Sequence, residues 1–398
     1  MITAPTRRGL ATAAHRIPPL TGPILATFCV GTSGHAVAGL LPSLIAELHT
    51  SGVVAAQLAT VFAAICGLAG PLLAVATGSW ERRQLLAVCL LTLSAGDLLV
   101  AAAPTYTLLV AGRVLTALGA ALTTATAVGL AARTVAPTRS SPAIARTLTG
   151  LTLSLLLGVP GAAAVASVAG FRIAMALIAA LCAGAAVVVA ATAPTAAAPP
   201  EQGLRERLAA AARPGVAGVL GGGILTWTST GAVYPYLALL LGTHRGSGVP
   251  IGVYLAAYGL GAVIGTLAAG HLIDRFGPRA VLLGGSGSAA AALFLLDPAT
   301  ANPVTTLLVV AAWGAAAWSA APPLNAWLSD LGDNRTTPLL LSLGGGIVYL
   351  GMGIGGVLGG ALTDHAGPTW LPMAAAALAL AGCLPLSAAR TSPAIRSH

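Results

Sequence analysis

Residues 270 to 279 of this chain read GHLIDRFGPR, and long apolar runs lie on both sides of them. Only 7% of the 398 residues are charged, yet this stretch holds one aspartate and two arginines. Gly277 and Pro278 permit a tight turn at this point. Such a turn places the charges among water and headgroups, and it leaves the flanking apolar runs as candidates to cross a membrane.

The composition of the whole chain is typical of a membrane protein. Hydrophobic residues make up 57% of it and the mean hydropathy is +0.90, unlike soluble domains. Runs of about 20 apolar residues, enough to cross a bilayer, recur almost to the end, and they are too long and continuously apolar for barrel strands. We therefore predict an all-α integral membrane protein with twelve transmembrane helices. The predicted spans lie near residues 22 to 46, 53 to 77, 84 to 103, 106 to 130, 143 to 168, 171 to 193, 215 to 241, 251 to 273, 279 to 297, 302 to 323, 337 to 362 and 369 to 389.

The basic residues predict the orientation of these spans. All nineteen are arginines, and the formal net charge is +9. With the N-terminus in the cytoplasm, sixteen arginines fall on the cytoplasmic side, two fall outside and Arg113 lies inside the membrane. This distribution follows the positive-inside rule, so we expect both termini in the cytoplasm. The absence of lysine, with so much alanine and glycine, indicates a GC-rich bacterial genome, so the expected location is a bacterial plasma membrane. It gives no indication of a nucleic-acid partner, because no soluble basic domain is present.

A composition change near the middle divides the chain. Residues 194 to 213 pass from a Pro-rich stretch to a short charged amphipathic one, with six predicted spans on either side. Each half also has a charged hairpin between its second and third spans, at residues 79 to 84 and 274 to 279. Internal repeats that meet at a midplane site and rock against each other are a recurrent transporter design. The predicted segments are a cytoplasmic N-terminal segment (1 to 21), a first six-helix bundle (22 to 193), a cytoplasmic linker (194 to 213), a second six-helix bundle (214 to 389) and a cytoplasmic tail (390 to 398).

Three motifs along the chain form a set. The first is the hairpin with Gly270, Asp274, Arg275, Gly277 and Arg279, which resembles the hairpin signature of the major facilitator superfamily. In the fifth span, GVPGAAAVASVAGFR is similar to the motif of the superfamily's twelve-span drug:proton antiporters, and the matched positions are Gly158, Pro160 and Gly161. In the fourth span, LLVAGRVLTALGAA resembles the motif with a membrane-embedded arginine, here Arg113. Over about residues 22 to 389 the chain resembles bacterial efflux proteins for chloramphenicol, arabinose and related molecules, which implies two pseudo-symmetric six-helix bundles.

The resemblance implies roles for two of the motifs. The hairpin around Asp274 is expected to latch the cytoplasmic side while a substrate cavity faces outward, or else it is only a topology anchor. The motif in the fifth span is expected to bend the helix between the halves and limit leakage, or else it is plain helix packing.

Two departures from the family pattern bear on the mechanism. The first-half hairpin holds Trp80, Glu81, Arg82 and Arg83 but lacks the usual aspartate, so a latch there is weaker or built differently. Many relatives carry an acidic residue after GTS in the first span, where this chain has Gly34. If that carboxylate carries coupling protons in relatives, this protein uses another group or none.

Asp97 and Arg113 are the charged residues that the sequence places in the membrane interior. Each lies seven residues from an outer hairpin residue, Pro104 or Tyr106, so both are expected ~10 Å below that hairpin on antiparallel neighbours. A buried charge costs at least ~2.5 kcal/mol on insertion scales. A permanent salt bridge is one interpretation, and a proton taken up by Asp97 when the pair separates is another. In the third interpretation, the two side chains face different helices.

Further candidates line the cavity that the resemblance implies. His35, in the first span, is expected to carry a proton or bind substrate, or only to bond a neighbouring helix. The aromatic candidates for a substrate pocket are Trp227, Tyr234 and Tyr236 in the seventh span and Trp313 and Trp318 in the tenth, with Asn325 near the inner mouth. Some of these side chains could instead face lipid.

No sequence feature indicates an enzyme. The chain has no Gly-rich phosphate loop followed by lysine and no cluster of metal ligands, so we expect no cofactor and a proton gradient as the energy source. The leading hypothesis is proton-coupled efflux of a small organic compound, such as a drug, sugar or secreted metabolite. The alternatives are uptake or uncoupled facilitated transport, and a membrane receptor that moves nothing. The expected partners are the substrate, protons and membrane lipid, and the chain is expected to act as a monomer.

Overall fold

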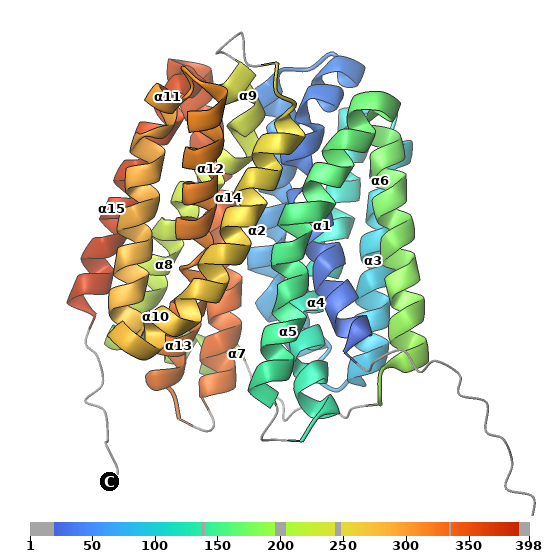
Figure 1. Cartoon of the computed structure of the whole chain (residues 1–398). Coiled ribbons are helices and arrows are strands. Elements are labelled where there is room, and N and C mark those ends of the chain that lie inside the picture. The colour runs from blue at the N-terminus through green and yellow to red at the C-terminus, as the bar shows by residue number, and fades with distance from the viewer. Residues whose placement is uncertain (1–19, 137–139, 196–203, 243–247, 334–335, 390–398) are drawn as a thin grey trace, which may run out of the picture.

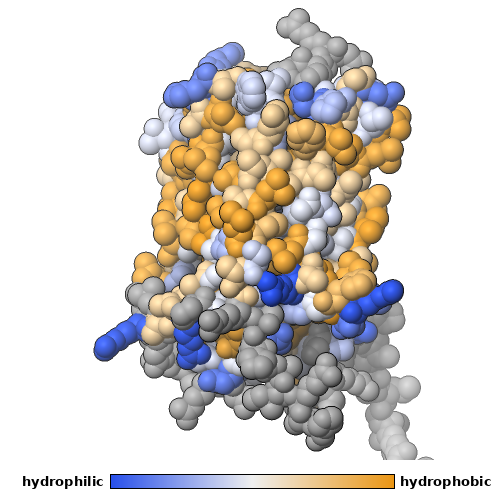
Figure 2. Space-filling model, turned by 90° about the vertical axis from the view of Figure 1, so that its left-hand side faces the viewer, coloured by the Kyte–Doolittle hydropathy of each residue, from blue (hydrophilic) through white to orange (hydrophobic). Residues whose placement is uncertain are grey.

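The computed structural model describes residues 20–136, 140–195, 204–242, 248–333 and 336–389. Within these ranges the chain is helical, and long helices run side by side through the whole height of the molecule (Figure 1). On the face shown in Figure 2, an apolar band, coloured orange, crosses the middle, and hydrophilic residues gather toward the two ends of the molecule. This is the surface expected of a helical protein that crosses a bilayer, and it confirms the predicted fold class.

The helices follow one another in two sets. The first set contains α1 (Thr21–Leu48), α2 (Gly52–Ala76), α3 (Arg82–Ala102), α4 (Tyr106–Thr134), α5 (Ser140–Leu153), the π-helical turn η2 (Ser154–Gly158) and α6 (Val159–Thr192). The second contains α7 (Leu204–Ala211), α8 (Pro214–Val233), η3 (Tyr234–Tyr236), α9 (Leu237–Gly242), α10 (Ile251–Phe294), α11 (Leu296–Ala299), α12 (Pro303–Trp318), α13 (Ala321–Asp330), α14 (Thr337–Ala366), η4 (Pro368–Trp370) and α15 (Leu371–Ala388).

Polar side chains mark the starts of several membrane helices. Ser51, Thr105 and Asn302 accept hydrogen bonds from the first backbone N–H groups of α2, α4 and α12. Glu81 does the same for α3, where its carboxylate accepts from the N–H groups of Arg83 and Gln84. These N–H groups have no partner within their own helix, so the caps determine where each apolar run becomes helical.

Two glycines turn the chain back between adjacent crossings. The described residues contain ten helical segments long and apolar enough to span a membrane. Two of these segments hold a residue with positive φ, Gly170 (φ 81°) and Gly277 (φ 79°), and each makes a hairpin there. A side chain at such φ would be strained, which is why glycine occupies both corners. The ten segments therefore give the predicted twelve crossings, and the turn predicted at Gly277 is confirmed.

Some helices extend beyond the predicted spans. The fourth span was predicted to end near residue 130, but α4 continues to Thr134. The tenth was predicted to end near residue 323, but α12 and α13 together continue to Asp330. Hydropathy marks the part of a helix in the hydrocarbon core, whereas backbone hydrogen bonding continues into the headgroup region.

The two halves meet along two helix pairs. α2 packs against α14, and α10 packs against η2 and α6. Small residues bring the backbones together: a Cβ at Gly67 would lie 2.9 Å from the Leu350 amide nitrogen, and one at Gly353 would lie 3.0 Å from the Ala64 nitrogen. Close approach of this kind is how membrane helices gain packing contacts in the absence of a hydrophobic driving force.

A glycine in α10 provides a test of this packing. Gly265→Ala places a Cβ against the backbone carbonyl of Ala315 in α12, which cannot move without shifting the helix. We expect a destabilisation of about 1–3 kcal/mol, seen as a lower melting temperature of the detergent-solubilised protein. Gly284→Ala, in the other arm of the α10 hairpin, meets no atom within 4 Å and is the control. Equal melting temperatures for the two variants would contradict the close-packing account.

Candidate substrate and proton site

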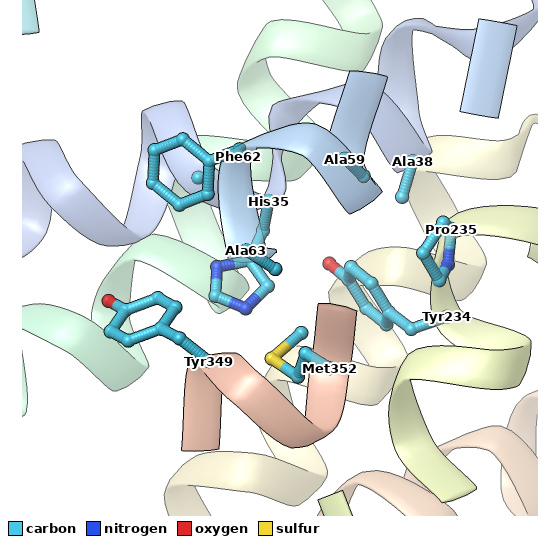
Figure 3. Close-up of a pocket in the computed structure, with 10 residues that line it drawn as sticks. His35, Ala38, Ala59, Phe62, Ala63, Tyr234, Pro235, Tyr349 and Met352 are labelled. Carbon is cyan, nitrogen blue, oxygen red and sulfur yellow. The ribbon is translucent and has the colours of Figure 1, made fainter. Parts of the chain in front are cut away.

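A narrow pocket lies between the halves, built by α1 and α2 on one side and by η3 and α14 on the other (Figure 3). Its lining residues are Gly34, His35, Ala38, Ala59, Phe62, Ala63, Tyr234, Pro235, Tyr349 and Met352. The cavity measures about 20 Å³, which is room for about one water molecule. Because both halves supply its walls, a drug-sized ligand would fit only when the halves move apart.

His35 lies at the centre of this pocket. Its side chain is buried, and Nδ1 lies 3.0 Å from the carbonyl oxygen of Gly31, one turn earlier in α1. Nε2 is also buried and has no hydrogen-bond partner among the described residues. The Tyr234 ring meets the imidazole edge-on at 5.5 Å between centroids, and the Trp318 ring lies 6.0 Å away. The structure thus brings His35 together with two of the predicted aromatic residues.

Five rings continue from His35 into the second half as one aromatic cluster: Trp227, Tyr234, Tyr258, Trp313 and Trp318. Trp318 Nε1 donates a hydrogen bond of 3.2 Å to the Tyr258 hydroxyl, and neighbouring ring centroids are 4.7–5.4 Å apart. All five side chains are buried, so none of the predicted members faces lipid. Tyr258 was not predicted, because the expected cavity helices did not include its span.

Tyr236 and Asn325 lie away from the pocket. Tyr236 belongs to the end of the bundle where α1 and α2 meet, and its hydroxyl donates to the Gly356 carbonyl at 2.6 Å. Gln57 of the first half donates to that hydroxyl at 2.9 Å, so this tyrosine joins the two halves. Asn325 lies in α13 beside Gly344, where a Cβ would be 2.8 Å from its Oδ1. Neither residue contributes to the cavity in this conformation.

Arg113 is buried near the pocket and forms no ion pair with a carboxylate among the described residues. Its guanidinium donates hydrogen bonds to the carbonyl oxygens of Leu58 (3.2 Å), Ser33 (3.1 Å) and Gly34 (3.4 Å). The same group lies over the Phe62 ring, with Cζ 4.6 Å from the centroid. It therefore binds the backbones of α1 and α2 and stacks on a residue that lines the cavity.

Asp97 is fully buried and is bound by hydroxyl groups. Oδ1 accepts from Ser33 Oγ at 2.9 Å and from Thr116 Oγ1 at 3.3 Å, and Oδ2 has no partner among the described residues. Asp97 and Arg113 form no ion pair, so the interpretation as a permanent salt bridge is wrong for this conformation. Ser33 connects them instead, because its hydroxyl binds Asp97 and its carbonyl binds Arg113.

The fifth-span motif produces a local widening of the helix. Val159 donates its backbone N–H to Ser154, a π-helical bond, immediately before Pro160, which has no N–H to donate. Gly158 lies against Thr32 of α1, where any side chain would overlap the threonine hydroxyl, whereas a Cβ at Gly161 would meet nothing within 4 Å. The widened turn lies against α10 of the other half. Its implied role in limiting leakage stays a prediction.

The second-half hairpin makes few contacts in this conformation. Arg279 donates to the Ser387 carbonyl, and the Arg275 guanidinium lies 5.2 Å from the Phe276 ring centroid. Asp274 is exposed and forms no ion pair with a described residue, and a Cβ at Gly270 would meet nothing within 4 Å. The latch contact is therefore absent from the described residues in this conformation, and the latch stays a prediction.

Two six-helix halves around a central pocket define the class of protein as a multi-pass membrane transporter rather than an enzyme. The family model described as Major Facilitator Superfamily matches residues 24–218 and 219–396. The chain belongs to this superfamily, as the motifs predicted.

Curated relatives resemble the chain over most of its length. A chloramphenicol resistance protein of Streptomyces lividans is 30% identical over 394 residues, covering 93% of this chain and 96% of the relative. A chloramphenicol efflux pump of Mycobacterium tuberculosis is 28% identical over 342 residues, covering 81% of each. The predicted resemblance to the drug-efflux branch is thereby confirmed.

Solved structures show the same fold at low identity. A peptide transporter in complex with sulfate has a TM-score of 0.75 and 13% identity, covering 93% of this chain and 94% of that one. The human organic anion transporter TETRAN has a TM-score of 0.73 and 14% identity, covering 92% and 98%. At this identity the likeness supports the arrangement of helices alone.

The Gln57–Tyr236–Gly356 contact predicts how the halves are held together. Tyr236→Phe removes the hydroxyl that binds both partners, so we expect faster hydrogen–deuterium exchange at residues 52–60 and 356–366. Tyr254→Phe is the control, since its hydroxyl makes no hydrogen bond with the described residues. Exchange that matches the control would mean that packing, with the direct 3.4 Å bond from Gln57 Nε2 to the Gly356 carbonyl, closes this end without the hydroxyl.

Proposed function

We propose that this protein exports a small organic compound from a bacterial cell in exchange for protons. The names of its relatives support a drug-like substrate, since two of them are a chloramphenicol resistance protein and an efflux pump. The arginine distribution supports a position in the inner membrane with both termini in the cytoplasm. In this proposal the chain works as a monomer without a cofactor, and the proton gradient supplies the energy.

The observation that carries the proposal is a buried acidic side chain and a buried basic side chain beside the pocket. Asp97 and Arg113 have no ion pair with each other, and Ser33 bonds to both. Ionisable side chains inside a membrane protein are expensive, and they commonly mark proton relays. A carboxyl group with one oxygen that has no hydrogen-bond partner among the described residues is suited to exchange a proton.

The coupling step that we propose has two states. In the first, Asp97 carries a proton and Arg113 binds the carbonyls of Ser33, Gly34 and Leu58. In the second, Asp97 is ionised and Arg113 turns to pair with it, which releases those carbonyls. Since two of them belong to α1, the exchange of partners frees the helix that holds His35 in the pocket. Proton release and movement of α1 are thereby one event.

Uncoupled facilitated transport is the second candidate. Gly34 occupies the position where many relatives carry an acidic residue, and this departure favours a carrier that needs no proton. Reconstituted transport distinguishes the two, because only an exchanger moves protons with the ligand.

We expect Asp97→Asn to abolish transport driven by a pH gradient, because an amide cannot take up and release a proton. Exchange of labelled for unlabelled ligand should persist, since it needs only opening and closing. The measurement uses proteoliposomes with an internal pH dye and radiolabelled ligands that include chloramphenicol, other antibiotics and simple sugars. Asp364→Asn, an exposed aspartate in α14, is the matched control.

Gradient-driven flux in Asp97→Asn equal to that of the wild type would contradict its role. Ligand flux in the wild type without any proton signal would contradict exchange itself and favour facilitated diffusion. Loss of folded Asp97→Asn protein would point to a structural role for this carboxyl group, as removal of a buried polar partner often does.

A further inference from the structure

We infer that His35 Nε2 accepts a hydrogen bond from an O–H or N–H group of an uncharged aromatic ligand, and that a proton competes with the ligand for this atom. The inference rests on the proposed function, since it takes the central pocket as the transport site. It deepens that proposal by naming the class of ligand and the atom at which ligand and proton exclude each other.

The contact to Gly31 determines which ring nitrogen is available. A backbone carbonyl oxygen only accepts hydrogen bonds, so the 3.0 Å contact requires that Nδ1 of His35 carries the hydrogen. In the neutral imidazole the other nitrogen then has a lone pair and no hydrogen. Nε2 is buried without a partner among the described residues. The pocket thus offers a ligand one hydrogen-bond acceptor at its centre.

Tyr234 supplies a second polar contact beside the first. Its hydroxyl is turned toward the His35 ring in Figure 3, and it too is buried without a partner among the described residues. A hydroxyl both donates and accepts, so it can bind either kind of ligand atom. Two adjacent unpaired polar groups in a pocket of otherwise apolar surface are costly unless a ligand or water binds them.

The remaining walls favour a flat ligand without charge. Phe62, Tyr349 and Met352 present ring faces and a thioether, and no lining residue is acidic or carries a permanent positive charge. The guanidinium of Arg113 lies behind the Phe62 ring and disfavours a cationic ligand. An anion would bury its charge without an ion-pair partner in the lining. An aromatic body with a hydroxyl or amide N–H donor satisfies both the walls and His35.

Protonation of His35 removes the acceptor that such a ligand needs. In the imidazolium both nitrogens are donors, so Nδ1 still binds Gly31 while Nε2 presents a hydrogen in place of a lone pair. The ligand donor and the proton therefore cannot occupy Nε2 together. In a chain with Gly34 at the position of the usual acidic residue, this gives exchange a point of competition within the pocket itself.

Other titratable groups near His35 could also make ligand binding depend on pH. Their chemistry excludes most of them, and the experiment below tests the one that remains. Tyr234, Tyr258 and Tyr349 reach the site from η3, α10 and α14, and Arg113 reaches it from α4. Tyrosine hydroxyls and guanidinium groups ordinarily stay protonated between pH 4.5 and 8, so neither changes its charge in this range. Asp97 of α3, which meets α1 through Ser33, is the remaining group that could give a pH dependence.

The test is equilibrium binding of chloramphenicol to the purified full-length protein in nanodiscs, by calorimetry between pH 8 and pH 4.5. Chloramphenicol is uncharged and aromatic and has hydroxyl and amide donors. We expect the wild type to bind more weakly at pH 4.5 than at pH 8, because a protonated Nε2 no longer accepts the hydrogen bond of the ligand. In His35→Gln, which keeps an acceptor oxygen but does not titrate, affinity should be the same at both pH values. His35→Asn is the second variant should the first fail to fold.

Several results would overturn the inference. These are a pH dependence that persists in His35→Gln, a pH dependence that vanishes in Asp97→Asn, and a failure of folded wild type to bind chloramphenicol at any pH. Tighter binding of the aromatic cation tetraphenylphosphonium than of chloramphenicol would contradict the uncharged ligand class. Since binding is measured without a membrane gradient, proton-coupled flux with pH-independent binding would reject this inference and leave the proposed function standing. Competition at His35 without proton flux would support this inference and reject proton exchange as the function.

Discussion

The hydrogen bonds of Arg113 are the interaction on which the rest of the site depends. A guanidinium in the membrane interior must find partners within the protein, and here it finds three backbone carbonyls and one ring face. Those partners belong to α1 and α2, so one charge holds α1, α2 and α4 in a common arrangement. His35 follows directly after Gly34, whose carbonyl is bound, and its place in the pocket is a consequence.

The sequence predicted the heights of the buried charges but not their partners. Counting from Pro104 and Tyr106 put Asp97 and Arg113 at matching depth, because the rise per residue of a helix is constant. The rotation of each helix about its axis depends on side-chain packing, which periodic patterns in a uniformly apolar segment do not reveal. Ser33 of α1 therefore went unnoticed as the residue that joins them. Turns were predicted better, since only glycine tolerates the backbone at Gly277.

The residues that line the pocket were also predicted only in part. Tyr234 and Trp318 were predicted because their spans were expected to face a central cavity, and both lie against His35. Phe62, Tyr349 and Met352 were missed because α2 and α14 were not expected to contribute. A signal was present in the sequence, however. The small-residue faces around Gly67 and Gly353 let these two helices meet between the halves, so an aromatic residue near such a face reaches the centre.

The neighbours of Gly34 explain why this position has no side chain. A Cβ there would lie 2.9 Å from Phe62 Cε1, so an acidic side chain would displace the ring that covers Arg113. The acidic side chain that the resemblance implies for many relatives at this position is therefore incompatible with the stacking of Phe62 on the guanidinium. A neutral ring screens the pocket from Arg113 at the place where a carboxylate would have faced it. With that charge absent, His35 is the basic side chain among the described residues that line the pocket.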